Sequence, residues 1–276
     1  MDREHEPLGS LLTKKKRDLE LEAGATAHFE DPAWYTRTYA RRQADVAYYR
    51  ALAKKRRAKA VLEYGIGNGR IALPLARDGV SVTGIERSSP MMADLSARLA
   101  KEPAVVRSRV TVKKGDMRKA TTGKRFPLVI APFNIVLHLY ERDDVEKWLA
   151  CVRAQIDPKG ELVLDVNMPI MEDLADPPGT SYRLAPVTHP TFGKVPYEEV
   201  FDYDRVRQIQ FCAMCFGDKQ VTPLAHRVFF PQELEALLHY NGFETTALYG
   251  DFEEGPLKPD SDVMIFHARP RKTGRN

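Results

Sequence analysis

Residues 61–70 of the chain read VLEYGIGNGR. The apolar run at residues 60–63 predicts a short strand, and residues 70–77 after the glycines predict a helix. Glycine at three alternate positions, Gly65, Gly67 and Gly69, lets the backbone turn sharply and lets a ligand approach without a Cβ in the way. This stretch therefore predicts a ligand-binding turn between a strand and a helix, although a tight turn with no ligand remains open.

Two acidic residues, Glu63 and Glu86, suggest which ligand the turn would bind. Residues 81–85 predict the next strand, and Glu86 stands at its tip, where a carboxylate can accept both hydrogen bonds of a ribose diol. A dinucleotide fingerprint, G-x-G-x-x-G, would require glycine at Arg70. Glu63 at the start of the turn is a poor neighbour for a pyrophosphate and a good one for a cation. These charges favour S-adenosylmethionine, which carries an ammonium and a sulfonium, over NAD.

Strands and helices alternate around this turn. Helices are predicted at 91–99 and 144–155, and strands at 110–113, 128–131 and 161–166. Alternation of this kind indicates a parallel sheet covered on both faces. Residues 231–240 predict a further helix, and 245–249 and 263–268 predict two final strands.

The region between these blocks has a different character. From 168 to about 230 the chain is rich in Pro and Gly, with short aromatic runs at 197–203, 209–216 and 225–230 that predict a small antiparallel lobe. We therefore predict four parts. These are a mobile N-terminal arm (1–25), an α/β domain (26–168 and 229–270), an inserted β-rich cap lobe (169–228) and a basic tail (271–276).

The order of these motifs resembles class I S-adenosylmethionine-dependent methyltransferases. Glu63 and the three glycines resemble motif I of that family, and Glu86 matches its ribose-binding acid. Lys114-Gly115-Asp116-Met117 resembles the segment whose aspartate meets the adenine amine, and Pro132-Phe133-Asn134 with His138 resembles motif IV. The resemblance covers roughly 60–167 and 231–269. It implies an α/β fold with a Rossmann-like, mostly parallel seven-stranded sheet flanked by helices, and a small antiparallel lobe inserted after strand five.

The resemblance also implies a set of site residues. Those expected to bind S-adenosyl-L-methionine are Tyr35, Tyr39, Glu63, Gly65, Gly67, Gly69, Glu86, Arg87, Met91, Asp116, Met117, Pro132 and Asn134. His138 is the candidate base or substrate-orienting group, and a histidine pinned under the lobe without chemistry is the alternative. Weaker candidates for substrate contact, for each of which a structural role competes, are Asn167, Arg183, Tyr197 and Arg227.

The expected activity is methyl transfer to a nitrogen or oxygen of a small molecule. Adenine and glutamine methyltransferases carry (N/D)-P-P-(Y/F) at motif IV, whereas residues 131–134 read APFN. This form of motif IV resembles that of the small-molecule branch with a cap lobe, which includes glycine and sugar N-methyltransferase-like enzymes. Two alternatives stay open: an RNA methyltransferase that uses the basic ends of the chain, and a non-catalytic methyltransferase-like interaction module.

Composition sets wider limits. The 276 residues carry a formal net charge of +4, and no apolar stretch approaches the roughly 20 residues that span a bilayer. The charged N-terminus lacks a signal-peptide pattern, so we expect a cytoplasmic protein, monomeric or homodimeric, that contacts no membrane and is unlikely to bind nucleic acid. Cys212 and Cys215 form a C-x-x-C inside a predicted strand, where they would face opposite ways, so no metal site is expected.

Overall fold

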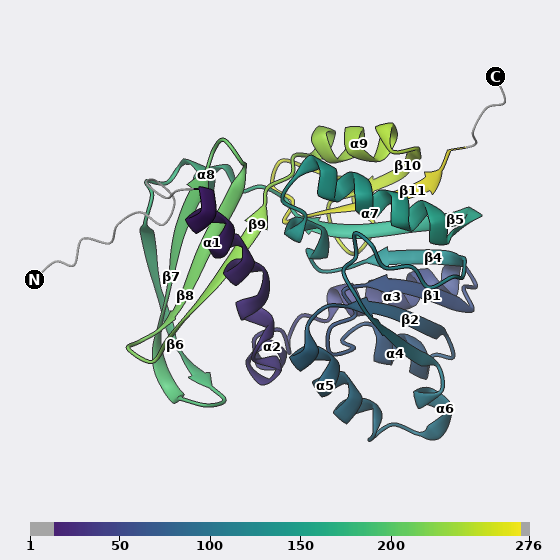
Figure 1. Cartoon of the computed structure of the whole chain (residues 1–276), viewed down its shortest axis with the longest axis horizontal. Helices are drawn as coiled ribbons and strands as arrows, with labels where there is room; N and C mark the ends of the chain where they lie inside the picture. The colour runs from purple at the N-terminus through teal and green to yellow at the C-terminus, as the bar shows by residue number, and fades with distance from the viewer. Residues whose placement is uncertain (1–13, 272–276) are drawn as a thin grey trace, which may run out of the picture. The chain divides into compact units, whose positions relative to one another are not determined.

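The computed structural model describes residues 14–271, and the chain divides into two units. One unit, here called the lobe unit, contains the chain up to Tyr39 together with Pro169–Phe229. The other, the α/β unit, contains Ala40–Met168 and the chain from Phe230 onward. Figure 1 shows the elements of both. Residues 1–13 of the predicted arm and 272–276 of the predicted tail lie outside the described residues.

The α/β unit is built on one seven-stranded sheet with the order β10-β11-β5-β4-β1-β2-β3. All neighbours pair in parallel except β11, which is antiparallel to both β5 and β10. The predicted mostly parallel seven-stranded sheet is therefore confirmed. Its strands are β1 (Ala60–Tyr64), β2 (Ser81–Glu86), β3 (Val110–Lys114), β4 (Phe126–Ala131), β5 (Ile156–Asn167), β10 (Phe243–Tyr249) and β11 (Val263–Pro270).

Helices cover both faces of this sheet, which explains why its central strands are almost wholly apolar. The helices of the unit are α3 (Ala44–Lys55), α4 (Ala72–Arg77), α5 (Ser89–Leu99), α6 (Ala104–Arg107), η2 (Ile135–His138), α7 (Arg142–Gln155) and α9 (Pro231–Tyr240). Leu52 of α3 and Leu73 of α4 share a buried cluster with Val61 of β1. On the opposite face, the ring of Trp148 of α7 meets that of Tyr64 of β1 at 5.9 Å.

The strand order determines where a ligand would bind. β1 lies between β2 and β4, so successive strands leave it in opposite directions and a crevice opens beyond its carboxyl end. The glycine turn follows β1 directly. Among residues 14–271, no helix is long and apolar enough to cross a bilayer.

The lobe unit contains a separate four-stranded antiparallel sheet with the order β6-β7-β8-β9, which confirms the lobe predicted after strand five. Its strands are β6 (Thr180–His189), β7 (Gly193–Asp204), β8 (Ile209–Phe216) and β9 (Gln220–Arg227), and α8 (Met171–Ala175) precedes them. Cys212 pairs with Phe201 and Cys215 with Glu198, so the two thiols lie on opposite faces of the sheet. No metal-binding group of His, Cys, Asp and Glu occurs among the described residues.

The first described segment belongs with this sheet and not with the α/β unit. It forms α1 (Lys14–Thr26), η1 (Ala27–Phe29) and α2 (Pro32–Thr38). Sequence placed residues 26–39 in the α/β domain, and the structure differs because Trp34 of α2 packs in the lobe core with Val195, Met214 and Phe216. Burial of an indole ring contributes about 2–3 kcal/mol, less the cost of the buried Nε1–H, which has no hydrogen-bond partner among the described residues.

Candidate functional site

The glycine turn is shaped both by the protein's own packing and by open space. All three glycines adopt the left-handed conformation, Gly65 with φ +70°, Gly67 with φ +54° and Gly69 with φ +83°. A Cβ at Gly65 would lie 2.6 Å from Cγ1 of Ile135, so packing alone requires that glycine. A Cβ at Gly67 would lie 3.3 Å from Cε of the buried Met91 and would meet no closer described atom. Gly67 is therefore the point where a ligand can approach the backbone closely.

Glu63 precedes this turn and has an unsatisfied carboxyl oxygen. Its side chain is buried, and Oε2 has no hydrogen-bond partner among the described residues. Burial raises the pKa of Glu63 well above its usual range, the charge of Arg70 opposes that rise, and the charge of Glu86 adds to it. A buried carboxyl oxygen without a partner is costly unless a ligand donor or cation completes it. The residues present thus fit the ammonium of S-adenosylmethionine.

Glu86 lies at the tip of β2, as predicted, and is held by backbone donors. Its carboxylate accepts hydrogen bonds from the N–H groups of Gly67 (2.8 Å), Arg87 (2.8 Å) and Ser88 (2.7 Å). Burial raises the pKa of Glu86, and these three donors partly offset the rise. The structure therefore ties the predicted ribose acid directly to the glycine turn, while the Arg87 side chain is exposed.

Asp116 has a partner within the protein. It accepts from the backbone N–H of Arg118 at 2.9 Å and from its guanidinium at 2.6 Å, and that guanidinium also reaches Asp144 at 2.8 Å. The hydrogen bond from Arg118 lowers the pKa of Asp116, so it is a carboxylate acceptor at neutral pH. Met117 beside it is half-buried. Contact of these two residues with an adenine ring remains a prediction.

The segment that resembles motif IV is strained. Phe133 (φ +57°) and Asn134 (φ +63°) are consecutive non-glycine residues in the left-handed region, directly after the buried Pro132. Such residues cost about 1–2 kcal/mol each and persist only where neighbours hold them. The backbone N–H of Asn167 donates to Oδ1 of Asn134 at 2.7 Å, so the predicted Asn167 contributes through its backbone while its side chain is exposed.

Asp165 of β5 fastens this strained segment. Its Oδ2 accepts from the N–H of Phe133 at 2.9 Å, its carbonyl oxygen accepts from the N–H of Asn134 at 3.1 Å, and its Oδ1 accepts from the hydroxyl of Tyr49 at 2.5 Å. The side chain is fully buried, and that burial raises its pKa to about 6. Sequence reasoning missed Asp165, although a charged residue inside the apolar run LVLDV was the available signal.

Two arginines flank the aromatic ring of this segment. The guanidinium carbons of Arg42 and Arg70 lie 4.7 Å and 4.6 Å from the ring centroid of Phe133. The buried Asp45 accepts two hydrogen bonds from Arg70, one of them at 2.9 Å, and one from Arg42 at 3.3 Å. Sequence reasoning treated Arg70 only as a mismatch to the dinucleotide pattern and missed Arg42 and Asp45, because no local spacing links α3 to the glycine turn.

His138 ends η2 and is half-buried. Its Nδ1 lies 3.4 Å from the hydroxyl of Tyr140, and the two rings meet edge to face at 6.4 Å. This geometry fixes the ring within the α/β unit a few residues after the strained segment. Its role as a base or orienting group remains a prediction.

Tyr35 and Tyr39 lie in the lobe unit, in a cluster with His28. Their rings meet edge to face at 4.9 Å, and the Tyr39 hydroxyl lies 3.0 Å from Nε2 of His28. Burial lowers the pKa of His28 to about 4, so this imidazole is neutral at physiological pH. The two tyrosines predicted to contact the cofactor are therefore packed against each other within the unit that holds the four-stranded sheet.

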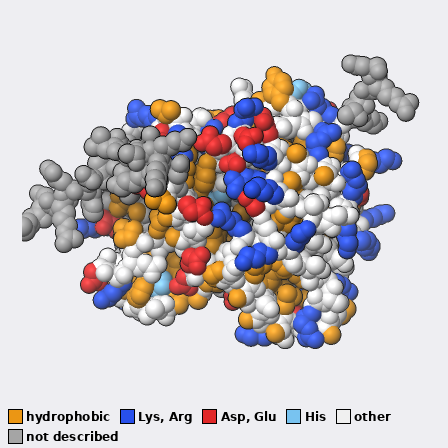
Figure 2. Space-filling view, viewed as in Figure 1, with side chains coloured by type: hydrophobic (Ala, Val, Ile, Leu, Met, Phe, Trp, Pro, Cys, Tyr) orange, Lys and Arg blue, Asp and Glu red, His pale blue; other side chains and the backbone are white. Residues whose placement is uncertain are grey.

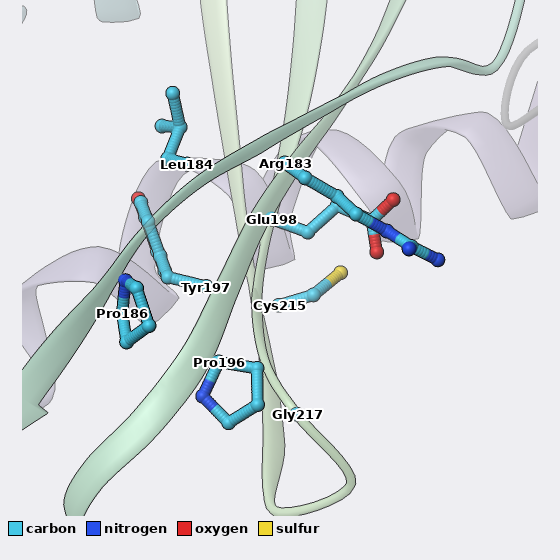
Figure 3. A pocket seen from close by; sticks show the side chains of 8 residues that line it. All are labelled: Arg183, Leu184, Pro186, Pro196, Tyr197, Glu198, Cys215 and Gly217. Carbon is cyan, nitrogen blue, oxygen red and sulfur yellow. The ribbon is translucent and has the colours of Figure 1, made fainter.

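The three lobe candidates do not converge. Cross-strand pairing places Arg183 opposite Glu198 and Leu184 opposite Tyr197, so Arg183 and Tyr197 lie on opposite faces of the sheet. Figure 3 shows a pocket that Arg183 and Tyr197 both line, but the Tyr197 side chain is directed away from those of Arg183, Glu198 and Cys215.

Arg227 is engaged at the end of β9. Its guanidinium donates to the carbonyl oxygens of Gln208 (3.3 Å) and Val228 (2.7 Å) and lies over the ring of Phe229. These contacts favour a structural role.

Comparison with known proteins agrees with this geometry. A model of a methyltransferase domain matches residues 61–160. The chain is 25% identical over 234 residues to a glycine/sarcosine N-methyltransferase of Aphanothece halophytica, covering 84% of this chain and 83% of that protein. The CcbJ methyltransferase from Streptomyces caelestis superposes with a TM-score of 0.72 at 25% identity, over 83% of this chain and 90% of that one.

A further solved structure, the glycopeptide N-methyltransferase MtfA in complex with S-adenosylmethionine, has the same fold. It superposes with a TM-score of 0.55 at 24% identity, over 76% of this chain and 86% of that one. The matched residues 61–160 span the glycine turn, Glu86, Asp116 and the strained segment. Residues 61–160 therefore form a methyltransferase domain, and the fold and the relatives support an S-adenosylmethionine-dependent methyltransferase of class I.

Proposed function

We propose that this enzyme methylates an amine nitrogen of a small molecule. The observation that carries the cofactor half of this proposal is the unsatisfied Oε2 of buried Glu63 beside the glycine turn, which fits a cationic ligand. The acceptor half is supported by relatives whose names specify N-methylation, among them the glycine/sarcosine enzyme. A hydroxyl acceptor is the alternative within the same chemistry.

Each cofactor contact follows from the chemistry of the residue. Glu63 would bind the ammonium group, Glu86 the ribose hydroxyls and Asp116 the adenine amine. Gly67 leaves room for the ligand along the backbone, and Met91 and Met117 supply apolar contact. When bound, S-adenosylmethionine supplies an activated methyl group and the thioether leaving group.

The strained segment would form the acceptor side of the α/β unit. Phe133 and Asn134 are held by Asp165 and Asn167, so their backbone is preorganised instead of adapting on binding. His138, four residues after Asn134 at the end of η2, would orient the acceptor or accept its proton. An amine that arrives neutral needs little more from the protein than position.

The RNA alternative is less well supported. The basic run at 54–57 is partly neutralised, because Lys55 pairs with Glu254 at 2.8 Å and Arg56 with the buried Glu161 at 2.5 Å. On the face drawn in Figure 2, basic side chains are interspersed with acidic ones. We also propose a cytoplasmic location and a monomeric or homodimeric state, on the sequence grounds given above.

The decisive experiment has two stages. Calorimetric titration with S-adenosylhomocysteine, with NAD as the control, tests the cofactor site without knowledge of the acceptor. Production of S-adenosylhomocysteine is then measured with paired amine and hydroxyl acceptors of the same carbon skeleton. Turnover restricted to the amines supports the proposal, and turnover restricted to the hydroxyl partners or to RNA would refute it.

A further inference from the structure

One face of the lobe sheet carries a carboxylate among aromatic rings. Glu199 of β7 pairs with Tyr182 of β6 and with Met214 of β8. Alternation along β7 puts Tyr197 and Phe201 on the same face as Glu199. The partly buried carboxylate therefore has an apolar or aromatic side chain on each of its four sides.

The position of the carboxylate is fixed by a hydrogen bond. The hydroxyl of Tyr197 donates to Oε1 of Glu199 at 2.5 Å, and the Tyr197 ring is braced by Phe216 at 5.3 Å and Trp34 at 6.3 Å. Burial raises the pKa of Cys212 on the next strand, and the charge of Glu199 raises it further. The carboxylate thus lies over this face, toward β8, and does not extend away from it.

Glu199 has no cationic partner among the side chains that the structure describes. No described Lys or Arg forms an ion pair with it, and its Oε2 accepts no hydrogen bond from a described residue. A second carboxylate, Asp176, accepts from the hydroxyl of Tyr182 at the edge of the same face. The negative charge of this surface is therefore left for a ligand to balance.

Aromatic rings with a carboxylate are the chemistry that recognises an organic ammonium ion. The ring faces attract the cation through their quadrupoles, and the carboxylate adds a charge-assisted hydrogen bond. A neutral alcohol of the same shape can donate one hydrogen bond to the carboxylate, but it lacks the positive charge that the rings and the carboxylate attract. The surface formed by Tyr182, Tyr197, Glu199 and Phe201 thus distinguishes a protonated amine from a hydroxyl compound.

We propose that this surface, here called the amine platform, binds a small organic ammonium ion through Glu199. The proposal goes beyond the proposed function by assigning a cation-binding residue to the lobe unit. It involves Tyr197 and not Arg183, which lies on the opposite face of the sheet.

The sequence itself provides a matched control. Glu198 adjoins Glu199 but pairs with Arg183 and Cys215, so its side chain lies on the opposite face (Figure 3). Glu199→Gln and Glu198→Gln therefore remove the same charge from adjacent positions of one strand. Only the first removes it from the amine platform.

The test measures binding of two probes to the full-length protein by ligand-observed NMR, with S-adenosylhomocysteine present. The probes are benzylamine, which is protonated at neutral pH, and benzyl alcohol. We expect Glu199→Gln to weaken benzylamine binding about five- to tenfold, the effect of losing one partly exposed charge contact. Glu198→Gln should leave it unchanged, and benzyl alcohol should bind wild type and both variants equally weakly.

Three outcomes would overturn the amine platform: no benzylamine binding to wild type, equal binding to wild type and Glu199→Gln, or equal losses in both variants. Circular dichroism and S-adenosylhomocysteine titration of each variant separate these outcomes from misfolding. Failure of wild type to bind S-adenosylhomocysteine would instead count against the proposed function.

Discussion

Replacement of Asp165 by Asn tests how the strained segment is held. The amide cannot ionise, its oxygen can still accept from the N–H of Phe133, and its NH2 group can donate to the hydroxyl oxygen of Tyr49. Asp165→Asn therefore imitates the protonated carboxyl. We expect the variant to gain free energy of unfolding relative to wild type as pH rises, because it avoids an ionised carboxylate in the core.

The magnitude follows from the pKa of Asp165, which burial raises from 3.8 to about 6. The native carboxyl binds its proton more tightly than the unfolded chain does. Its stabilising contribution is therefore fully present below pH 3.8 and is lost as pH rises through about 6. A shift of about two units corresponds to about 3 kcal/mol in total, of which about 2 kcal/mol falls between about pH 4.5 and about pH 7.5.

The assay is urea unfolding of wild type and Asp165→Asn across this pH range. Titrating groups that do not interact with Asp165 cancel in the difference between the two proteins. Asp157→Asn, at the half-buried start of the same strand, is the matched control for an Asp-to-Asn change on β5. A stability difference between Asp165→Asn and wild type that stays constant with pH would refute the reasoning.

Three other variants test the site. Gly67→Ala should cost about 1 kcal/mol of stability because of its φ of +54°, and it should also weaken S-adenosylhomocysteine binding. The control Gly79→Ala, at φ +92° in open space, should cost stability alone. Urea unfolding measures the stability of both variants, and calorimetry measures their ligand binding. Because burial raises the pKa of Glu63, binding of the ligand's ammonium should release a proton from Glu63, and the affinity should rise with pH. Calorimetry in buffers of different ionisation enthalpy measures this proton release, which should be absent in Glu63→Gln. Asn134→Ala should lose about 2 kcal/mol in urea unfolding, since it keeps the strain and loses the bond from Asn167.

Short-range sequence patterns predicted most strands of the two sheets. The strand at 209–216 and the helix at 231–240 were predicted to the residue, because the first is a short apolar and aromatic run and the second has apolar residues at helical spacing. The strand β6 (Thr180–His189) was missed. It lies at the edge of the lobe sheet, most of its side chains are exposed, and Pro186 interrupts it, so it lacks the alternation that marks a half-buried strand.

The candidate site likewise contains residues that local sequence patterns predict and residues that they do not. Glu63, the glycines and Glu86 lie in short segments whose chemistry and spacing are visible in the sequence. The roles of three other residues can be recognised only in the folded chain, where they lie close to the segment after β4: Arg42, Asp45 and Asp165. Contacts between residues so distant along the chain depend on tertiary packing, which no window of sequence contains.

The two-segment construction of the lobe unit has a consequence for its biosynthesis. Trp34 leaves the ribosome about 160 residues before Val195, and the sheet is incomplete until Arg227 has been made. At about 5–20 residues per second, the first segment waits about 10–40 s for its partner strands. During that interval its apolar surface is available to chaperones and to other nascent chains, and a slow stretch of translation after residue 39 would lengthen the exposure. Cellular yield of the enzyme should therefore respond to synonymous codon changes that leave the mature protein identical.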